Sequence, residues 1–134
     1  MGLPYVTVAV RNPAAPERCW EGLFLVDTGA VDTLVPACHL RALGLAPKGR
    51  RASELADGSE LQLDITTADL EFMGDVVGST IIFGADDAEP LLGVTALESV
   101  GITVDPRSQR LKRLPAVSLK RATPTPAAAP TAPS

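Results

Sequence analysis

The chain has 134 residues, a formal net charge of −4, and 46% hydrophobic residues, of which few are aromatic. This length fits one domain with a single, mainly aliphatic core. The acidic balance and the lack of a large basic patch argue against nucleic acid as a partner, and no segment approaches the roughly 18 consecutive apolar residues that a membrane span needs.

Most of the chain has the composition of β-strands, with β-branched or alternating apolar residues between turn-forming residues. In chain order, strands are predicted over residues 5–10, 20–26, 52–56, 60–66, 69–73, 76–83, 102–105 and 110–114. A loop is expected at 12–16, which contains two prolines. The Asp57-Gly58 pair predicts a hairpin, because this pair between two strands favours a tight turn.

Two short helices are predicted between the strands. The first covers residues 36–43, since Pro36 suits a first helical turn and Gly44 suits the end of a helix. The second covers residues 94–100 and follows a short apolar element, Leu91-Leu92-Gly93. Residues 1–116 are predicted to form the domain. Residues 117–134 are predicted to be a disordered tail, because they end in a run of only Ala, Pro, Thr and Ser.

The thiols and the single histidine give no sign of a metal or a nucleophile. Cys19 and Cys38 lack C-x-x-C spacing, and no signal-peptide pattern is visible. We therefore expect a cytoplasmic protein with free, reduced, partly buried thiols, although spacing leaves a disulfide between them open. His39 follows Cys38 on a predicted helix, where neighbours do not face each other. The acidic loop 86–90 could hold a hard cation, but a solvated loop is the simpler interpretation, so neither metal nor cofactor is expected.

Asp27 is the strongest candidate for a functional residue. The apolar residues 24–26 predict a buried strand that ends in Asp27, with Thr28 beside it and Gly29 permitting a tight turn. A carboxylate held rigidly at a strand end can act as a general base. The alternative is a turn aspartate that only caps its neighbours.

Three features in this order resemble the retropepsin-like aspartic proteases, which are single-domain, homodimeric relatives of pepsin, and they resemble most a single-domain member of the bacterial type. They are Asp27-Thr28-Gly29-Ala30, the hairpin around Asp57-Gly58, and Leu92-Gly93 followed by a helix. The resemblance covers nearly all of residues 3–116. It implies an all-β fold, in which a homodimer is built from closed β-barrels with one or two short helices.

The resemblance also implies roles for individual residues. Asp27 matches the catalytic aspartate, the hydroxyl of Thr28 matches the group that links the two active-site loops of the dimer, and the backbone of Gly29 matches the surface that lies against bound peptide. The hairpin of residues 52–63 matches the flap over the substrate, and Leu92-Gly93 matches the element beneath the catalytic loop. The positions implied to contact substrate are Ala30, Asp32, Ala56, Asp57, Gly58 and Ser59. For Asp32 the alternative is an acidic residue of the surface or of a turn.

Carboxylate chemistry explains why two copies are needed. One ionised carboxylate takes a proton from water, and one protonated carboxyl group donates to the scissile carbonyl. Two carboxylates held close together share a proton, because both cannot easily ionise. The chain carries one Asp-Thr-Gly motif. Two chains must therefore meet at a two-fold axis, the commonest symmetry of oligomers.

Two positions depart from the viral pattern. Viral members often carry an acidic residue after Asp-Thr-Gly-Ala and an arginine after the apolar-apolar-Gly element, whereas both positions are apolar here, Val31 and Val94. The loss is matched, so no charge is left buried without a partner. The dimer must be held by other contacts, for which the strands near 5–10 and 110–114 are candidates.

The expected function is that of an aspartic endopeptidase that cleaves peptide or protein substrates as a homodimer. The peptide is expected to bind as an added strand, with apolar subsites. The alternative is a dimer of the same fold that binds a peptide or protein without cutting it.

Overall fold

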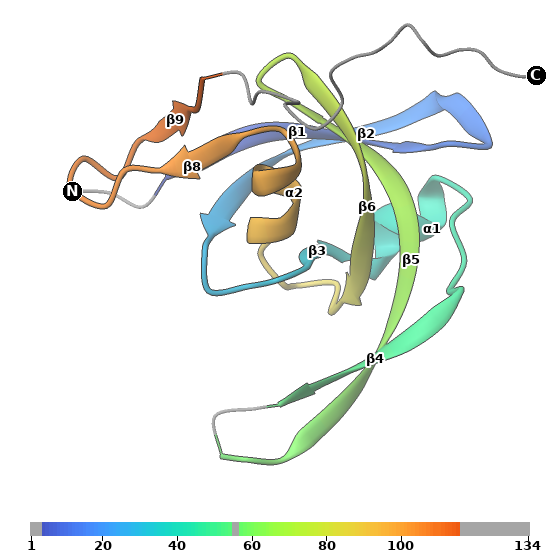
Figure 1. Cartoon of the computed structure of the whole chain (residues 1–134). Helices are drawn as coiled ribbons and strands as arrows, with labels where there is room; N and C mark the ends of the chain where they lie inside the picture. The colour runs from blue at the N-terminus through green and yellow to red at the C-terminus, as the bar shows by residue number, and fades with distance from the viewer. Residues whose placement is uncertain (1–3, 55–56, 116–134) are drawn as a thin grey trace, which may run out of the picture.

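The computed structural model describes residues 4–54 and 57–115. The predicted tail of residues 117–134 and the predicted site residue Ala56 lie outside the described residues. The described part is mostly β-structure, which confirms the predicted class (Figure 1). Its elements are β1 (Tyr5–Asn12), β2 (Ala15–Asp27), β3 (Thr33–Pro36), α1 (Ala37–Ala42), β4 (Gly49–Glu54), β5 (Glu60–Phe72), β6 (Asp75–Gly84), β7 (Leu91–Gly93), α2 (Val94–Ser99), β8 (Ile102–Val104) and β9 (Leu111–Arg113).

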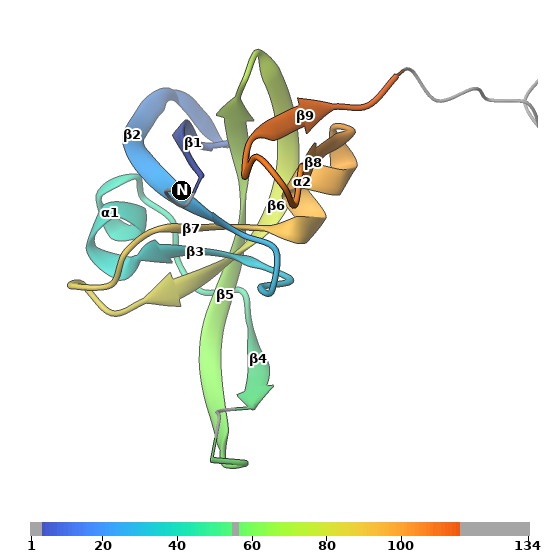
Figure 2. The same cartoon turned by 90° about the vertical axis from the view of Figure 1, so that its left-hand side faces the viewer.

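The first seven strands form one sheet in the order β1-β2-β7-β3-β6-β5-β4. β1 also pairs with β5, through Ala9, Val10 and Arg11, so the pairings lead around from β1 and return to it. β4 pairs with β5 outside this circuit. The hairpin of β4 and β5 consequently extends away from the rest of the molecule (Figures 1 and 2).

The core is mainly aliphatic, as the composition predicts, because strands of this sheet turn alternate residues inward. On β1 the buried residues include Val8 and Val10, and on β5 the buried residues are Thr66, Ala68, Leu70 and Phe72. The strand pattern therefore continues through the polar middle of β5, where sequence alone predicts a break.

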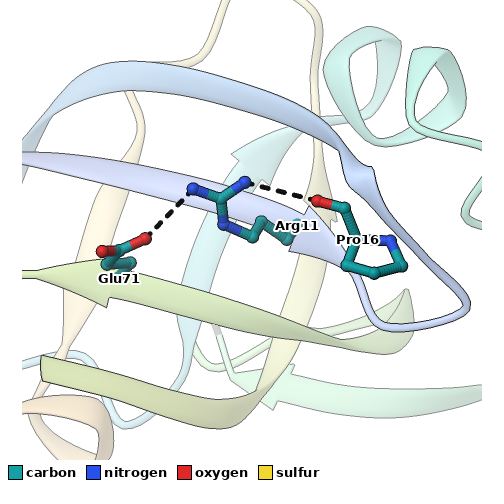
Figure 3. A network of polar contacts seen from close by, with 3 residues as sticks. All are labelled: Arg11, Pro16 and Glu71. Carbon is teal, nitrogen blue, oxygen red and sulfur yellow. Dashed lines mark hydrogen bonds and ion pairs between the residues drawn. The ribbon is translucent and has the colours of Figure 1, made fainter.

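An outward-facing arginine fastens the contact between β1 and β5. The guanidinium of Arg11 donates a hydrogen bond to Glu71 on β5 at 3.1 Å and another to the carbonyl of Pro16 on β2 at 3.3 Å (Figure 3). Both ends of the ion pair are partly exposed, so its contribution to stability is modest. Its effect is to join three neighbouring strands.

The glycine at the end of the first helix acts as the sequence predicts. Gly44 has a φ of +82°, and its N–H donates to the carbonyl of Arg41 at 2.9 Å. The N–H of Leu45 donates to the carbonyl of Leu40 at 3.0 Å, and both leucine side chains are buried. These two bonds and the apolar contact form a Schellman ending.

Several boundaries differ from the sequence predictions. The expected loop at 12–16 is shorter, because β1 runs to Asn12 and β2 starts at Ala15. The two strands predicted at 60–66 and 69–73 are one strand, β5, and β3 was not predicted. The hairpin around Asp57-Gly58 and both short helices are confirmed, as are the last two predicted strands, which pair with each other as β8 and β9.

The last hairpin, β8 and β9, forms a separate two-stranded sheet. Arg113 on β9 ties it to the turn between β5 and β6, through an ion pair with Asp75 and a hydrogen bond of 2.8 Å to the carbonyl of Met73. Among the described residues, no helix has the length and apolar character required to cross a membrane.

Candidate active site

Asp27 ends β2, whose buried residues Phe24 and Val26 precede it. Its carboxylate Oδ1 accepts a hydrogen bond from the N–H of Gly29 at 2.9 Å, and its carbonyl accepts one from the N–H of Ala30 at 3.1 Å. The side chain is half-buried. The carboxylate is thus held at the strand end as predicted, and it also makes the hydrogen bond of a turn aspartate.

A segment from the far end of the sequence supports the loop after Asp27. β7 runs parallel to β2 and places Gly93 opposite Asp27. The first two residues of α2 then donate their backbone N–H groups to the loop, Val94 to the carbonyl of Ala30 at 2.8 Å and Thr95 to that of Val31 at 3.2 Å. N–H groups that a helix start leaves unpaired are therefore used to fix the loop.

Gly93 and Thr33 close the base of this loop. A Cβ on Gly93 would lie 2.5 Å from the carbonyl carbon of Asp32, so only glycine allows β7 to approach so closely. The N–H of Gly93 donates to the hydroxyl of Thr33 at 3.0 Å, and Thr33 is 1% exposed. Gly93 thus packs beneath the loop that follows Asp27.

Part of the loop that follows Asp27 is exposed to solvent in the single chain. Thr28 and Gly29 are exposed, and Val31 is 62% exposed. Val94 is half-buried.

Asp32 forms an ion pair with Arg51 of β4, in which the guanidinium Nη1 donates to Oδ2. The Asp32 side chain is 11% exposed, whereas that of Arg51 is 42% exposed. The carboxylate is thus nearly enclosed, and its partner reaches it from the strand that begins the projecting hairpin. The pair connects β4 to the loop after Asp27.

A pocket of about 480 Å³ lies between these two elements. Its walls come from residues 29–32 of the loop, residues 51–54 of β4, and Ile82 of β6. Of the residues implied to contact substrate, Ala30 and Asp32 therefore lie together here, beside Gly29. Asp27 and Thr28 are adjacent in the chain but do not line this pocket.

The tip of the hairpin lies elsewhere. Asp57 accepts hydrogen bonds from the N–H of Ser59 at 2.9 Å and from its hydroxyl at 2.6 Å, and these bonds lower the pKa of Asp57. Gly58 has a φ of +88°, as a tight turn requires. In the single chain Asp57, Gly58 and Ser59 are exposed at the end of the projecting hairpin and do not line the pocket (Figure 2).

No protein-family model matches this chain, and no curated protein sequence matches it either. The site must therefore be judged by its geometry. That geometry provides a carboxylate at a strand end, a loop fixed by β7 and α2, and a pocket beside it.

The arrangement of the described residues does not favour a cysteine nucleophile or a metal site as an alternative to Asp27. Cys19 and Cys38 are free, and both are exposed rather than partly buried as predicted, because Cys19 points outward from β2 and Cys38 lies in the first turn of α1. His39 stacks on Trp20 with ring centroids 4.0 Å apart. The part of the chain that the structure describes contains no group of three or more acidic, cysteine or histidine side chains that could hold a metal.

Two residues of the site were not predicted, Arg51 and Thr33. Arg51 lies just before the segment assigned to the flap, and nothing in its sequence neighbourhood indicates a partner at Asp32. Thr33 carries a usable signal, since it is a polar residue at the start of the apolar run Leu34-Val35. A buried hydroxyl at such a place needs a hydrogen-bond partner.

Proposed function

We propose that this protein is an aspartic endopeptidase of the retropepsin type, which cleaves peptide or protein substrates as a homodimer. The observation that carries the proposal is the support of Asp27. Its strand is paired with β7 and its loop accepts hydrogen bonds from α2, so the carboxylate has a fixed position before substrate binds. Such preorganisation is what general acid–base chemistry requires.

In the proposed dimer, the two Asp27 side chains meet at the two-fold axis and share one proton. The ionised carboxylate takes a proton from water, whose oxygen attacks the scissile carbonyl carbon. The protonated partner donates to the carbonyl oxygen. As the tetrahedral intermediate collapses and the C–N bond breaks, the carboxyl group that took the proton from water gives it to the leaving nitrogen, and a hydroxyl of the intermediate returns a proton to the other carboxylate. The exposed Thr28 and Val31 lie on the loop that would face the second chain.

The arrangement of strands supports the finer points of this proposal. We interpret the circuit of pairings from β1 back to β1 as a closed barrel, and the projecting β4–β5 hairpin as the flap. The outer edge of β4 offers backbone groups to which an extended peptide could add as a strand. The cytoplasm is the compartment we propose, since free thiols such as Cys19 and Cys38 are maintained there.

An activity assay with a matched control tests the proposal. Wild type, Asp27→Asn and Asp105→Asn would each be incubated with a mixed peptide library at mildly acid pH, with cleavage read by mass spectrometry. Asp105 is a suitable control because its Oδ1 accepts a backbone N–H two residues on, at 2.9 Å, as Asp27 does. We expect wild type and Asp105→Asn to cleave and Asp27→Asn to lose activity.

Absence of cleavage by wild type at every pH and protein concentration would overturn the enzyme proposal. Capture of peptides without cleavage would support the non-catalytic binding module instead. Equal activity of wild type and Asp27→Asn would exclude Asp27 from the chemistry.

A further inference from the structure

A second pocket, of about 380 Å³, lies where the segment between α1 and β4 passes β5 (Figure 1). Its walls come from residues 12–14 of the turn between β1 and β2, from residues 44–48, and from Thr66 and Thr67 of β5. It shares no lining residue with the pocket beside Asp27. We propose that this second pocket binds a small monocarboxylate with an apolar body, held by Lys48 and Arg18. This inference goes beyond the proposed protease function and does not depend on it.

Two cationic side chains give the second pocket its charge. Lys48 lines it and donates a hydrogen bond from Nζ to the hydroxyl of Thr67 at 2.7 Å, a bond that occupies one of the three N–H groups of the ammonium. Arg18 lies over the wall, since a Cβ on Gly44 would meet its Nη1 at 2.8 Å. Neither cation forms an ion pair within residues 4–54 and 57–115, and no lining residue is acidic. The excess of positive charge attracts an anion.

The backbone around the second pocket favours a carboxylate over a phosphate. Pro13 and Pro47 have no backbone N–H. The backbone N–H groups of four other lining residues are already donated within the protein, those of Ala14, Gly44, Leu45 and Lys48. Phosphate groups are typically held by several backbone N–H groups, whereas a carboxylate is well satisfied by a guanidinium and an ammonium. The donors that remain here are those of charged side chains.

The rest of the lining favours an apolar body on the ligand. Aliphatic carbon atoms come from Pro13, Ala14, Leu45, Ala46 and Pro47, and of these only Leu45 is buried. An apolar ligand would remove the exposed carbon atoms from water, which is favourable. A volume of about 380 Å³ is near the lower end for ligand pockets. The ligand is therefore small, either a free branched acid or the last residue of a peptide chain.

Titration of the full-length protein, followed by the NMR resonances of its backbone amides, tests the inference. The probes are 4-methylpentanoate, its neutral amide and inorganic phosphate. We expect 4-methylpentanoate to shift the resonances of Gly44, Lys48 and Thr67 with a dissociation constant on the order of 1 mM. The neutral amide should bind about tenfold more weakly, because it lacks the charge. Phosphate should also bind more weakly than the acid.

Variants of the two cations test the same site from the protein side. Lys48→Met should raise the dissociation constant of 4-methylpentanoate about tenfold, Lys48→Arg should stay close to wild type, and Arg18→Met should weaken binding severalfold. Lys112→Met is the matched control, because it removes the same charge from an exposed lysine of β9 outside the pocket. It should leave binding unchanged. Circular dichroism would establish that each variant is folded, and the comparison of acid with amide needs no variant.

Two acetylated tripeptides ending in leucine distinguish the sources of the carboxylate. Binding of the peptide with a free C-terminal carboxylate, but not of its C-terminal amide, would assign the site to chain ends as well. Binding of 4-methylpentanoate alone would restrict the site to small free acids.

Several results would overturn the inference. These are the absence of shifts at the lining residues, equal affinity for the acid and its amide, phosphate binding as tight as that of the acid, and unchanged binding in both Lys48→Met and Arg18→Met. None of these measurements depends on peptide cleavage, so the proposed protease function would stand or fall separately.

Discussion

The hydrogen bond that the Asp27 carboxylate accepts from the N–H of Gly29 also occurs at other aspartates of this protein. Asp57 and Asp105 also accept a backbone N–H from the residue two positions on, at the same distance of 2.9 Å. What distinguishes Asp27 is its place at the end of a strand that is paired with β7. At the scale of a single residue, a turn aspartate and a candidate catalytic aspartate look alike, and the elements around them make the difference.

Another aspartate shows how a residue can complete an element to which it does not belong. The residue before α1 is Pro36, which has no side-chain oxygen to cap the helix. The carboxylate of Asp86 supplies the missing acceptor, since its Oδ1 accepts a hydrogen bond at 2.9 Å from the N–H of Cys38 in the first turn of α1. The acidic loop, considered above as a cation site, thus has a structural role at its first carboxylate.

Asp86→Ala should therefore destabilise the fold through α1. Loss of this cap should lower the free energy of unfolding by about 1 kcal/mol, the usual cost of removing an N-cap side chain. Urea denaturation followed by circular dichroism would measure it. Asp87→Ala removes the neighbouring exposed carboxylate and should stay close to wild type. Equal stability of the two variants would argue against the capping role.

At the scale of elements, the hydrogen bond between β3 and β7 holds the base of the candidate catalytic loop. Thr33→Val keeps the shape of the side chain but leaves the N–H of Gly93 without its acceptor in a buried place. We expect a loss of about 2 kcal/mol in the free energy of unfolding, since an unsatisfied buried donor costs about 1–3 kcal/mol. Chemical denaturation would measure this change.

Thr33→Ser is the matched control for that experiment. Serine retains the hydroxyl acceptor and loses one methyl group, so it should lie closer to wild type than valine does. If valine proved more stable than serine, packing of the methyl group rather than the hydrogen bond would be the main contribution of Thr33.

Local signals explain which elements could be predicted from sequence. Gly44 at the end of α1 and the Asp57-Gly58 pair in the β4–β5 hairpin have backbone preferences that act within a few residues. β3 has only four residues, and its pairing with β6 and β7 comes from distant parts of the chain. Arg51 was missed for the same reason, because its partner depends on how β4 lies over the loop.

At the scale of the whole molecule, the apolar pair at Val31 and Val94 bears on the proposed dimer. Val31→Glu would place a carboxylate, without the arginine that the viral retropepsins provide, on the loop that faces the second chain in the proposed dimer. We expect the dissociation constant of the dimer to rise on the order of tenfold or more, because an unpaired charge in an interface is costly. Sedimentation over a concentration series would measure it.

Val76→Glu is the matched control for the dimer. Val76 is 62% exposed, as is Val31, but it lies on β6 beside the turn from β5. It should leave the dissociation constant unchanged. A wild-type protein that stays monomeric at high concentration would contradict the proposed mechanism, and equal effects of both substitutions would place the interface elsewhere.

The position of β7 between β2 and β3 has a consequence for synthesis of the chain. The loop after Asp27 acquires its backing only when residues 91–95 are available to pair with it. While the ribosome is still producing the earlier residues, the Asp-Thr-Gly segment has been made but lacks the strand that positions it. If the proposed protease activity holds, a nascent or prematurely terminated chain would carry the Asp-Thr-Gly segment without an assembled site, and it could not cleave neighbouring proteins during translation.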